Sequence, residues 1–245
     1  MPGESVVGRA VRVVDAFRPG ETTLGVSEIA RRAGLHVATA SRLVAELVEL
    51  GLLRRDTDRK VGLGLRLWEL GSRASPALSL REAAMPPMED LHAVVGQHTQ
   101  LGVLDGEEVL FLERLSAPGA VVNYTRIAGR LPLHASSSGL VLLAHAGAEL
   151  QERTLAGPLR TFTPATIGTP AKLRAALDHV RREGVAFCPG FIHPDACGIA
   201  VPVRAPSGAV VAALAVIVPN DGDARAQIPA LRTAARGIGR RLVSR

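Results

Sequence analysis

Apolar residues recur at helical spacing through the first 51 positions, and glycine or proline interrupts the pattern three times. Ser5 can cap a first helix that Pro19-Gly20 ends, a second helix runs from Gly25 to Gly34, and a third ends at Gly51. The positions predicted to face the core are Val7, Ala10, Val11, Val14 and Phe17, then Val26, Ile29, Ala30 and Ala33, then Ala40, Leu43, Val44 and Leu47.

A short hairpin is predicted next, because Leu52-Leu53 and the stretch around Val61 and Leu63 flank a polar DTDR turn. Three helices followed by a hairpin give the element order of a winged helix-turn-helix. Residues 65–70, 72–79 and a helix over 80–95, irregular at Pro86-Pro87, are expected to form a connector. A domain boundary is therefore expected near residue 75.

The second half of the chain predicts an antiparallel sheet with helices, so the whole is expected to be α+β. Asp105-Gly106 lies between two strand-like runs, and the strands 199–204 and 210–218 flank a Pro-Ser-Gly turn. A helix is expected to begin at Thr169-Pro170 and end before Gly184. A final helix carries Leu231, Ala235, Ile238 and Leu242 on one side and Arg232, Arg236 and Arg240 on the other, an arrangement typical of a solvated face.

The third helix has a shallow outer face, formed mainly by Ala38, Thr39, Ser41, Arg42 and Ala45. An α-helix fits the DNA major groove, and small side chains let its backbone approach base edges and phosphates. The predicted DNA contacts are His36, Thr39, Ser41 and Arg42 on this helix and Arg54, Arg55, Arg59 and Lys60 in the hairpin. The alternative is a protein-binding helical module with a solvated charged face.

Composition and net charge bear on whether the chain folds and on what it binds. Hydrophobic residues make up 47% of the 245 positions, enough for folded domains, and the formal net charge is +6. Residues 1–75 carry 12 basic and 9 acidic side chains, so each part of the chain contributes +3 and bulk charge alone does not locate an anionic partner.

The chain is expected to be cytoplasmic and not membrane-bound. The longest apolar run, residues 208–219, is shorter than the roughly 20 residues of a membrane span. Glu4, Arg9 and Arg12 interrupt the segment that a signal peptide would need to be apolar, and two cysteines are too few for a disulfide framework.

Four stretches of the chain resemble the IclR family of bacterial transcriptional regulators. GVSEIARRAGLHVATASRLVAELVELGLLRRD is similar to the helix-turn-helix of that family, and KVGLGLRLWELG to the end of its wing. AGRLPLHASSSGLVLLA and GIAVPVRAPSGAVVAALAV are similar to parts of its effector-binding domain. The resemblance implies a winged helix over 1–75 with the start of a linker, then over 76–245 a linker helix with dimer contacts and a GAF-like domain that binds a small metabolite.

The resemblance also implies an effector pocket between the HASSSGL segment and the region from CPGFIHPDACGIA to ALAVIV. Hydroxyls and backbone N–H groups beside Gly139 can hold a carboxylate or a phenol. Because Leu140 stands where the family commonly has Lys, we expect either a less strongly charged effector or one whose acid group is held by neutral donors, with Arg130 as a candidate further contact. The expected contacts are Leu104, Arg130, Ser136, Ser137, Ser138, Gly139, Leu140, Cys188, Cys197 and Ile217.

Other chemistries are disfavoured. The serines near His134 lack a G-x-S-x-G elbow, so a pocket wall is preferred to a catalytic site. His193, Asp195 and Cys197 alternate and could share a face with Cys188 or His179, but the spacing is no recognised zinc signature. Trp68, the only tryptophan, is expected to anchor packing between wing and connector.

The sequence therefore predicts a ligand-responsive DNA-binding transcriptional regulator, a repressor in preference to an activator, without catalytic activity, cofactor or metal. The expected partners are double-stranded operator DNA, a small-molecule effector and further copies of the chain in a dimer or tetramer, with residues 80–95 as the contact region. The alternative is a small-molecule enzyme or sensor whose N-terminal module binds protein. Substrate turnover without DNA binding would distinguish it.

Overall fold

The structure is a computed structural model that describes residues 4–18, 20–73 and 76–242. The chain forms two compact units, Met1–Ser75 and Pro76–Arg245. Within the described residues the first unit is mostly helical and the second is built on an antiparallel sheet, which confirms the predicted α+β class.

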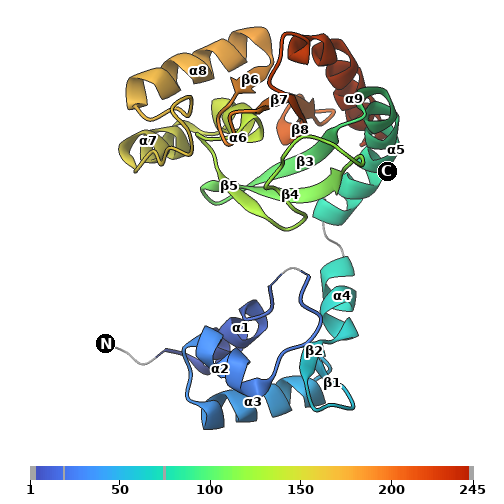
Figure 1. Ribbon diagram of the computed structural model, residues 1–245, viewed down its shortest axis with the longest axis vertical. Helices are drawn as coiled ribbons and strands as arrows, with labels where there is room; N and C mark the ends of the chain where they lie inside the picture. Colours follow the sequence, from blue (N-terminus) through green and yellow to red (C-terminus); the bar gives the residue numbers. More distant parts are fainter. Residues whose placement is uncertain (1–3, 19, 74–75, 243–245) are drawn as a thin grey trace. The chain divides into compact units, whose positions relative to one another are not determined.

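The first unit follows the predicted element order (Figure 1). Its elements are α1 (Val6–Asp15), α2 (Val26–Ala33), α3 (Val37–Glu49), β1 (Leu53–Arg55), β2 (Val61–Leu63) and α4 (Leu65–Ser72). Ser5 caps α1 by accepting a hydrogen bond from the Gly8 N–H, and Gly34 ends α2 in the left-handed conformation that glycine adopts without strain. Leu24 pairs with Val61 and so adds a third strand-like segment to the hairpin.

The second unit is a six-stranded antiparallel sheet with helices on both faces (Figure 1). Its strand order is β5-β4-β3-β8-β7-β6, and the predicted Asp105-Gly106 hairpin joins β3 to β4. The elements are α5 (Pro76–Val95), β3 (His98–Asp105), β4 (Glu108–Leu115), β5 (Arg130–Pro132), α6 (Ser137–Ala144), α7 (Ala148–Ala156), α8 (Pro170–Glu183), β6 (Ala186–Pro189), β7 (Ala196–Arg204), β8 (Val210–Pro219), the short 3-10 helix η1 (Ala224–Gln227) and α9 (Ile228–Arg241).

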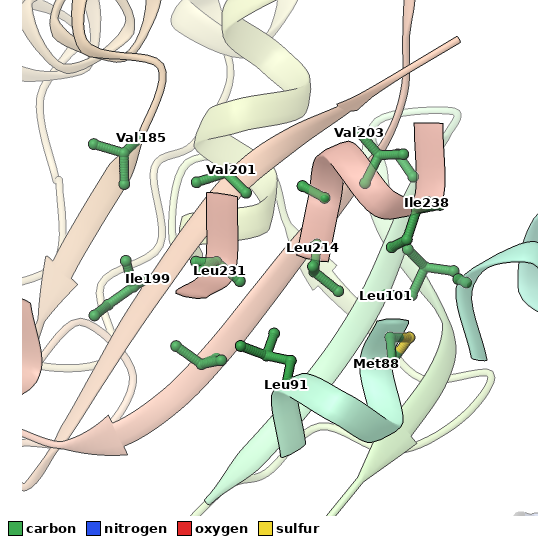
Figure 2. Packing of buried hydrophobic residues seen from close by; sticks show 14 of the residues in the cluster. Met88, Leu91, Leu101, Val185, Ile199, Val201, Val203, Leu214, Leu231 and Ile238 are labelled. Atoms are coloured by element: carbon green, nitrogen blue, oxygen red, sulfur yellow. The ribbon is translucent and has the colours of Figure 1, made fainter. Parts of the chain in front are cut away.

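Two cores lie on opposite faces of this sheet. Helices α5 and α9 cover one face, where Met88 and Leu231 pack toward Leu214 on β8 (Figure 2). Helices α6 and α8 cover the other, where Leu143 and Leu177 are buried. Because successive residues of a strand point to opposite faces, the parity of each strand residue decides which core its side chain joins.

Three local predictions were wrong. Val7 and Val11 are largely exposed, and Val13 and Ala16 fill the core side of the first helix instead. Trp68 is 71% exposed on α4, a helix with no buried residue, so it does not anchor packing in the single chain. The expected helix over 80–95 ends at Val95 as predicted but begins earlier, at Pro76. It continues through both prolines, because Pro87 and Met88 are buried within the second unit and tertiary packing offsets the missing N–H groups.

Candidate functional site

The outer face of α3 is exposed, as its pattern predicted. Ala40, Leu43, Val44 and Leu47 are buried, while Ala38, Ser41, Arg42 and Ala45 face solvent and Thr39 is half-buried. His36 is the exposed N-cap residue of α3, and its side chain makes no capping hydrogen bond. This outer face of α3 is therefore not needed for core packing, and it is shallow enough for close approach to another surface.

The β1–β2 hairpin adds four cations next to this helix in the same unit (Figure 1). Arg54, Arg55, Arg59 and Lys60 are exposed, and no ion pair between described residues involves any of them or Arg42. Asp56 does not pair with them. Its carboxylate accepts the backbone N–H of Lys60 at 2.8 Å and so shapes the turn.

An ion network holds the helices beneath this surface. Arg32 joins α2 to the rest of the unit by pairing with Glu21 and Glu28 and donating to the carbonyl of Ala16. Hydrogen bonds from Arg31 and then Arg32 lower the pKa of Glu28 to about 2. The network therefore positions the elements that carry α3, and it depends on an ionised Glu28.

The second unit contains a partly enclosed cavity at the N-terminal end of α6, with about 490 Å³ of empty space including its mouth. Side chains from β3, β6, β7, β8 and the segment 122–125 meet there. The lining residues are Gln100, Val122, Asn123, Tyr124, Thr125, Leu131, Ala135, Ser136, Ser137, Cys188, Phe191, Ile192, His193, Ala196, Gly198 and Ile217. None of these described residues is Lys, Arg, Asp or Glu, so the cavity is neutral unless His193 is protonated.

One residue that lines this cavity has a buried donor without a protein partner. The backbone N–H of Thr125 donates to Asn123 Oδ1 at 3.0 Å, which identifies that end of the amide as the acceptor. Asn123 Nδ2 is then left buried without a hydrogen-bond partner. Thr125 Oγ1 lies 2.6 Å from Gln100 Oε1 and so links the segment to β3. A buried donor without a partner is costly, and a ligand acceptor would satisfy it.

The first turn of α6 supplies further donors. Ser136 caps the helix through its hydroxyl, which accepts the Gly139 N–H at 3.1 Å. The first backbone N–H groups of a helix have no intrahelical partner and favour negative charge. Gly139 is required here for packing, because a Cβ at that position would lie 2.2 Å from the Leu133 carbonyl oxygen. The close approach places Ser136 and Ser137 at the cavity wall.

Of the expected effector contacts, Ser136, Ser137, Cys188 and Ile217 line the cavity. The other six expected contacts, Leu104, Arg130, Ser138, Gly139, Leu140 and Cys197, are not among its lining residues. Arg130 is instead paired with Asp105 and Glu108 at the sheet edge. Leu140 is buried in the core under α6, and Gly139 packs against Leu133.

The side chains of the two cysteines lie on opposite faces of the sheet. Cys197 belongs to the core under α5 and α9, whereas Cys188 belongs to the opposite core and reaches the cavity. Burial raises the pKa of both thiols, to about 11 for Cys197. His193 Nδ1 lies 3.9 Å from the exposed Asp195 carboxylate, but Cys197 is buried in the other core, so the three residues do not converge. No group of three or more possible metal ligands occurs in the described residues.

Sequence reasoning missed Gln100, Asn123, Tyr124 and Thr125, and it considered His193 only for metal binding. A signal existed for Gln100, a polar residue at a buried position on β3. Residues 123–125 carried no such signal in the sequence. The segment 116–129 has no regular structure, and only tertiary hydrogen bonds bring it over the sheet.

Comparisons with known proteins agree across both units. Residues 6–57 match the IclR helix-turn-helix domain, and residues 73–242 match the bacterial transcriptional regulator IclR C-terminal family. The HTH-type transcriptional regulator XynR of Escherichia coli is 33% identical over 218 residues, which cover 88% of this chain and 86% of that regulator. The described residues contain no helix long and apolar enough to cross a membrane.

Solved structures extend the likeness to three dimensions. The crystal structure of an IclR homologue from Microbacterium hydrocarbonoxydans complexed with 4-hydroxybenzoate is 48% identical, covers 98% of this chain and 100% of that one, and has a TM-score of 0.94. A transcriptional regulator structure from Rhodococcus sp. RHA1 is 30% identical with a TM-score of 0.83, covering 97% of this chain and 98% of that one.

Proposed function

The chain belongs to the IclR family of bacterial transcriptional regulators, and from that premise we propose that it represses transcription until an aromatic acid occupies the cavity beside α6. The family consists of DNA-binding regulators rather than enzymes. In this proposal α3 lies in the major groove of operator DNA, and the β1–β2 hairpin contacts the phosphate backbone.

A hydroxylated benzoate is the effector class that the cavity chemistry favours. The homologue complexed with 4-hydroxybenzoate supports this class. Here the donors are neutral: Asn123 Nδ2, the Ser137 hydroxyl and the N–H groups at the start of α6. The unsatisfied Asn123 donor carries the proposal, because a ligand carboxylate or phenol would supply the acceptor that the protein lacks. Phe191, Ile192 and Ile217 offer apolar walls for a ring.

Adjacent serines provide a matched test of the cavity. Ser137 lines it, whereas Ser138 is fully buried outside it with an unpaired hydroxyl. By calorimetry with 4-hydroxybenzoate, we expect Ser137→Ala and Asn123→Leu each to weaken affinity by about 1–2 kcal/mol, the range of a lost hydrogen bond. Ser138→Ala should leave the affinity unchanged. Equal affinity in all variants would place the ligand elsewhere, and absence of binding to the wild type would reject the effector class.

We further propose that the protein acts as a dimer and that the effector shifts the equilibrium between two placements of its DNA-binding units. Two-fold symmetry matches paired half-sites, and one small winged helix buries too little surface for tight specific binding. Six apolar residues of α5 are buried in the chain's own second unit, so that face is not free for a partner. Exposed Val7, Val11, Leu65 and Trp68 on α1 and α4 are the preferred contacts.

A further inference from the structure

An open groove in the second unit gathers four arginines from two elements. Arg232, Arg236 and Arg240 lie along α9, and Arg204 lies at the end of β7. The groove holds about 1020 Å³ of empty space open to solvent. Its remaining lining is mostly apolar: Val201, Pro202, Ala205, Pro206, Ala235, Gly184 and Gly239. The sequence pattern accounted for the helix arginines as a solvated face but did not indicate Arg204 or the groove.

Close packing of α9 against β7 creates this convergence. A Cβ at position 239 would lie 2.7 Å from the Arg204 carbonyl oxygen, so glycine is what allows the helix to approach the strand end. The backbone also holds two of the guanidinium groups. Arg232 donates to the Glu183 carbonyl at 2.7 Å. Arg204 donates to the Gly208 carbonyl at 2.9 Å and its Nη2 lies 3.1 Å from His145 Nε2 at the end of α6, so it is the Arg204 backbone that α9 packs against. The cations are therefore placed by the fold rather than extended freely into solvent.

The positive charge of the groove is not neutralised within the described residues. No Asp or Glu lines it, and none of its four arginines takes part in an ion pair there. Arg236 hydrogen-bonds only to the neutral Thr233 hydroxyl, at 3.3 Å. Arginines on α7 and α8 differ in this respect, because Arg153 and Arg174 are both paired with glutamates. Arg232, Arg236 and Arg240 are like charges spaced one helical turn apart on α9, and they favour an anionic occupant.

We propose that this groove binds an extended segment of a partner protein in which acidic and apolar residues alternate. Residues four apart on a helix rise by about 6 Å, and every second residue of an extended chain advances by about 6.6–6.8 Å. Alternate carboxylates can therefore meet successive arginines of α9, with guanidinium geometry suited to carboxylate. The intervening apolar side chains would cover the floor formed by Val201, Pro202 and Pro206, which offers nothing to a phosphodiester backbone.

The test uses the full chain and a fluorescein-labelled peptide of alternating Asp and Leu, measured by fluorescence anisotropy. The Arg236→Gln, Arg240→Gln double variant should bind this peptide about tenfold more weakly than the wild type, and added salt should weaken wild-type binding. Arg232 is left intact because it holds the end of α8. The matched control is Arg153→Gln with Arg174→Gln, which removes the same charge from α7 and α8 and should bind like the wild type.

Four outcomes would overturn the proposal. Absence of wild-type binding, or equal losses in the two double variants, would mean that the groove is not a specific acidic-peptide site. If the groove variant loses affinity for a random-sequence DNA duplex but not for the peptide, the surface contacts nucleic acid instead. If it loses only self-association by light scattering, the occupant is a second copy. Retained effector binding in every variant separates these outcomes from a failure of the proposed regulatory function.

Discussion

Individual polar residues differ in whether the folded chain already provides a partner for their side chains. Arg42 is exposed and unpaired among the described residues, so its guanidinium is available to a base or a phosphate. Asn123 is the opposite case, because its buried Nδ2 group is oriented by the Thr125 N–H and has no partner. The Glu28 carboxylate is paired with Arg31 and Arg32, so its role is structural.

Replacement of Arg42 tests the proposed base contact. Arg42→Ala is expected to weaken specific operator binding by about 1–3 kcal/mol and to relax sequence preference at one position of each half-site, because a bidentate contact to guanine is lost. Electrophoretic shift at one salt concentration measures this. Lys172→Ala, which removes one cation from the second unit, is the control. Wild-type affinity and selectivity in Arg42→Ala would remove this residue from the interface.

Acid sensitivity of the first unit tests the Glu28 network. Hydrogen bonds from Arg31 and Arg32 lower the pKa of Glu28 from its usual 4.5 to about 2. Ionised Glu28 therefore stabilises the fold fully above pH 4.5, and this contribution is lost as the pH falls toward 2. Melting curves by circular dichroism across that range should show a smaller acid-induced decrease in Glu28→Gln than in the wild type.

Glu49→Gln provides the matched control for that experiment, because it removes one carboxylate from the end of α3, outside the network. Its acid-induced decrease in melting temperature should follow that of the wild type. If Glu28→Gln and Glu49→Gln give the same curve, ionisation of Glu28 does not hold the helices together.

At the scale of elements, close backbone contacts fix the packing and conformation of short segments. In α6 every residue is buried, and Gly139 allows the helix to pack against Leu133. In the hairpin the turn is closed by Asp56, and Arg59 adopts a left-handed backbone conformation with φ of 60°. Non-glycine residues rarely adopt that conformation, so the turn holds Arg59 at its tip at some cost in strain.

The hairpin's role is tested by removing its charges without disturbing its turn. Arg59→Gly suits the left-handed conformation, and Lys60→Gln keeps the backbone N–H that bonds to Asp56. If both side chains contact phosphates, the slope of log affinity against log salt should become shallower by about two units, equally for operator and random DNA. An unchanged slope would show that the hairpin does not touch the DNA backbone.

At the scale of the whole molecule, the chain leaves apolar side chains without cover. Leu65 is 79% exposed and Trp68 is 71% exposed on α4, although both are large. Such exposure is typical of an interface, since burial of a large apolar side chain contributes about 1.5–3 kcal/mol. The two units also carry separate cores, which is the organisation that a shift between two domain placements requires.

Dimerisation through α4 can be measured directly. Leu65→Gln combined with Trp68→Gln is expected to weaken the dimer by at least about 2 kcal/mol in multi-angle light scattering over a dilution series. Val94→Gln, on an exposed position of α5, is the control. A monomeric wild type that still binds operator DNA specifically, or a larger effect from Val94→Gln, would contradict this assignment of the interface.

The sequence by itself determined the elements whose signals are local. Helical spacing identified the buried sides of α2, α3 and α9, and Ser5, Gly34 and Thr169 marked ends of α1, α2 and α8. The shallow outer face of α3 could also be read from residue order, because a helix repeats its faces at a constant angle. Four quoted stretches were enough to indicate the family.

Only the tertiary structure decided which distant residues meet. Cys197 and Cys188 were expected in one pocket, but the parity of β7 directs Cys197 to the core under α5 and α9. Hydrogen bonds from Val121 to Gln97 and from Thr125 to Gln100 bring Asn123, which lies between them, to the cavity. Close packing at Gly239 brings α9 against the backbone of Arg204 and so forms the groove. These juxtapositions depend on strand register and long-range hydrogen bonds, which have no periodic signature in a single sequence.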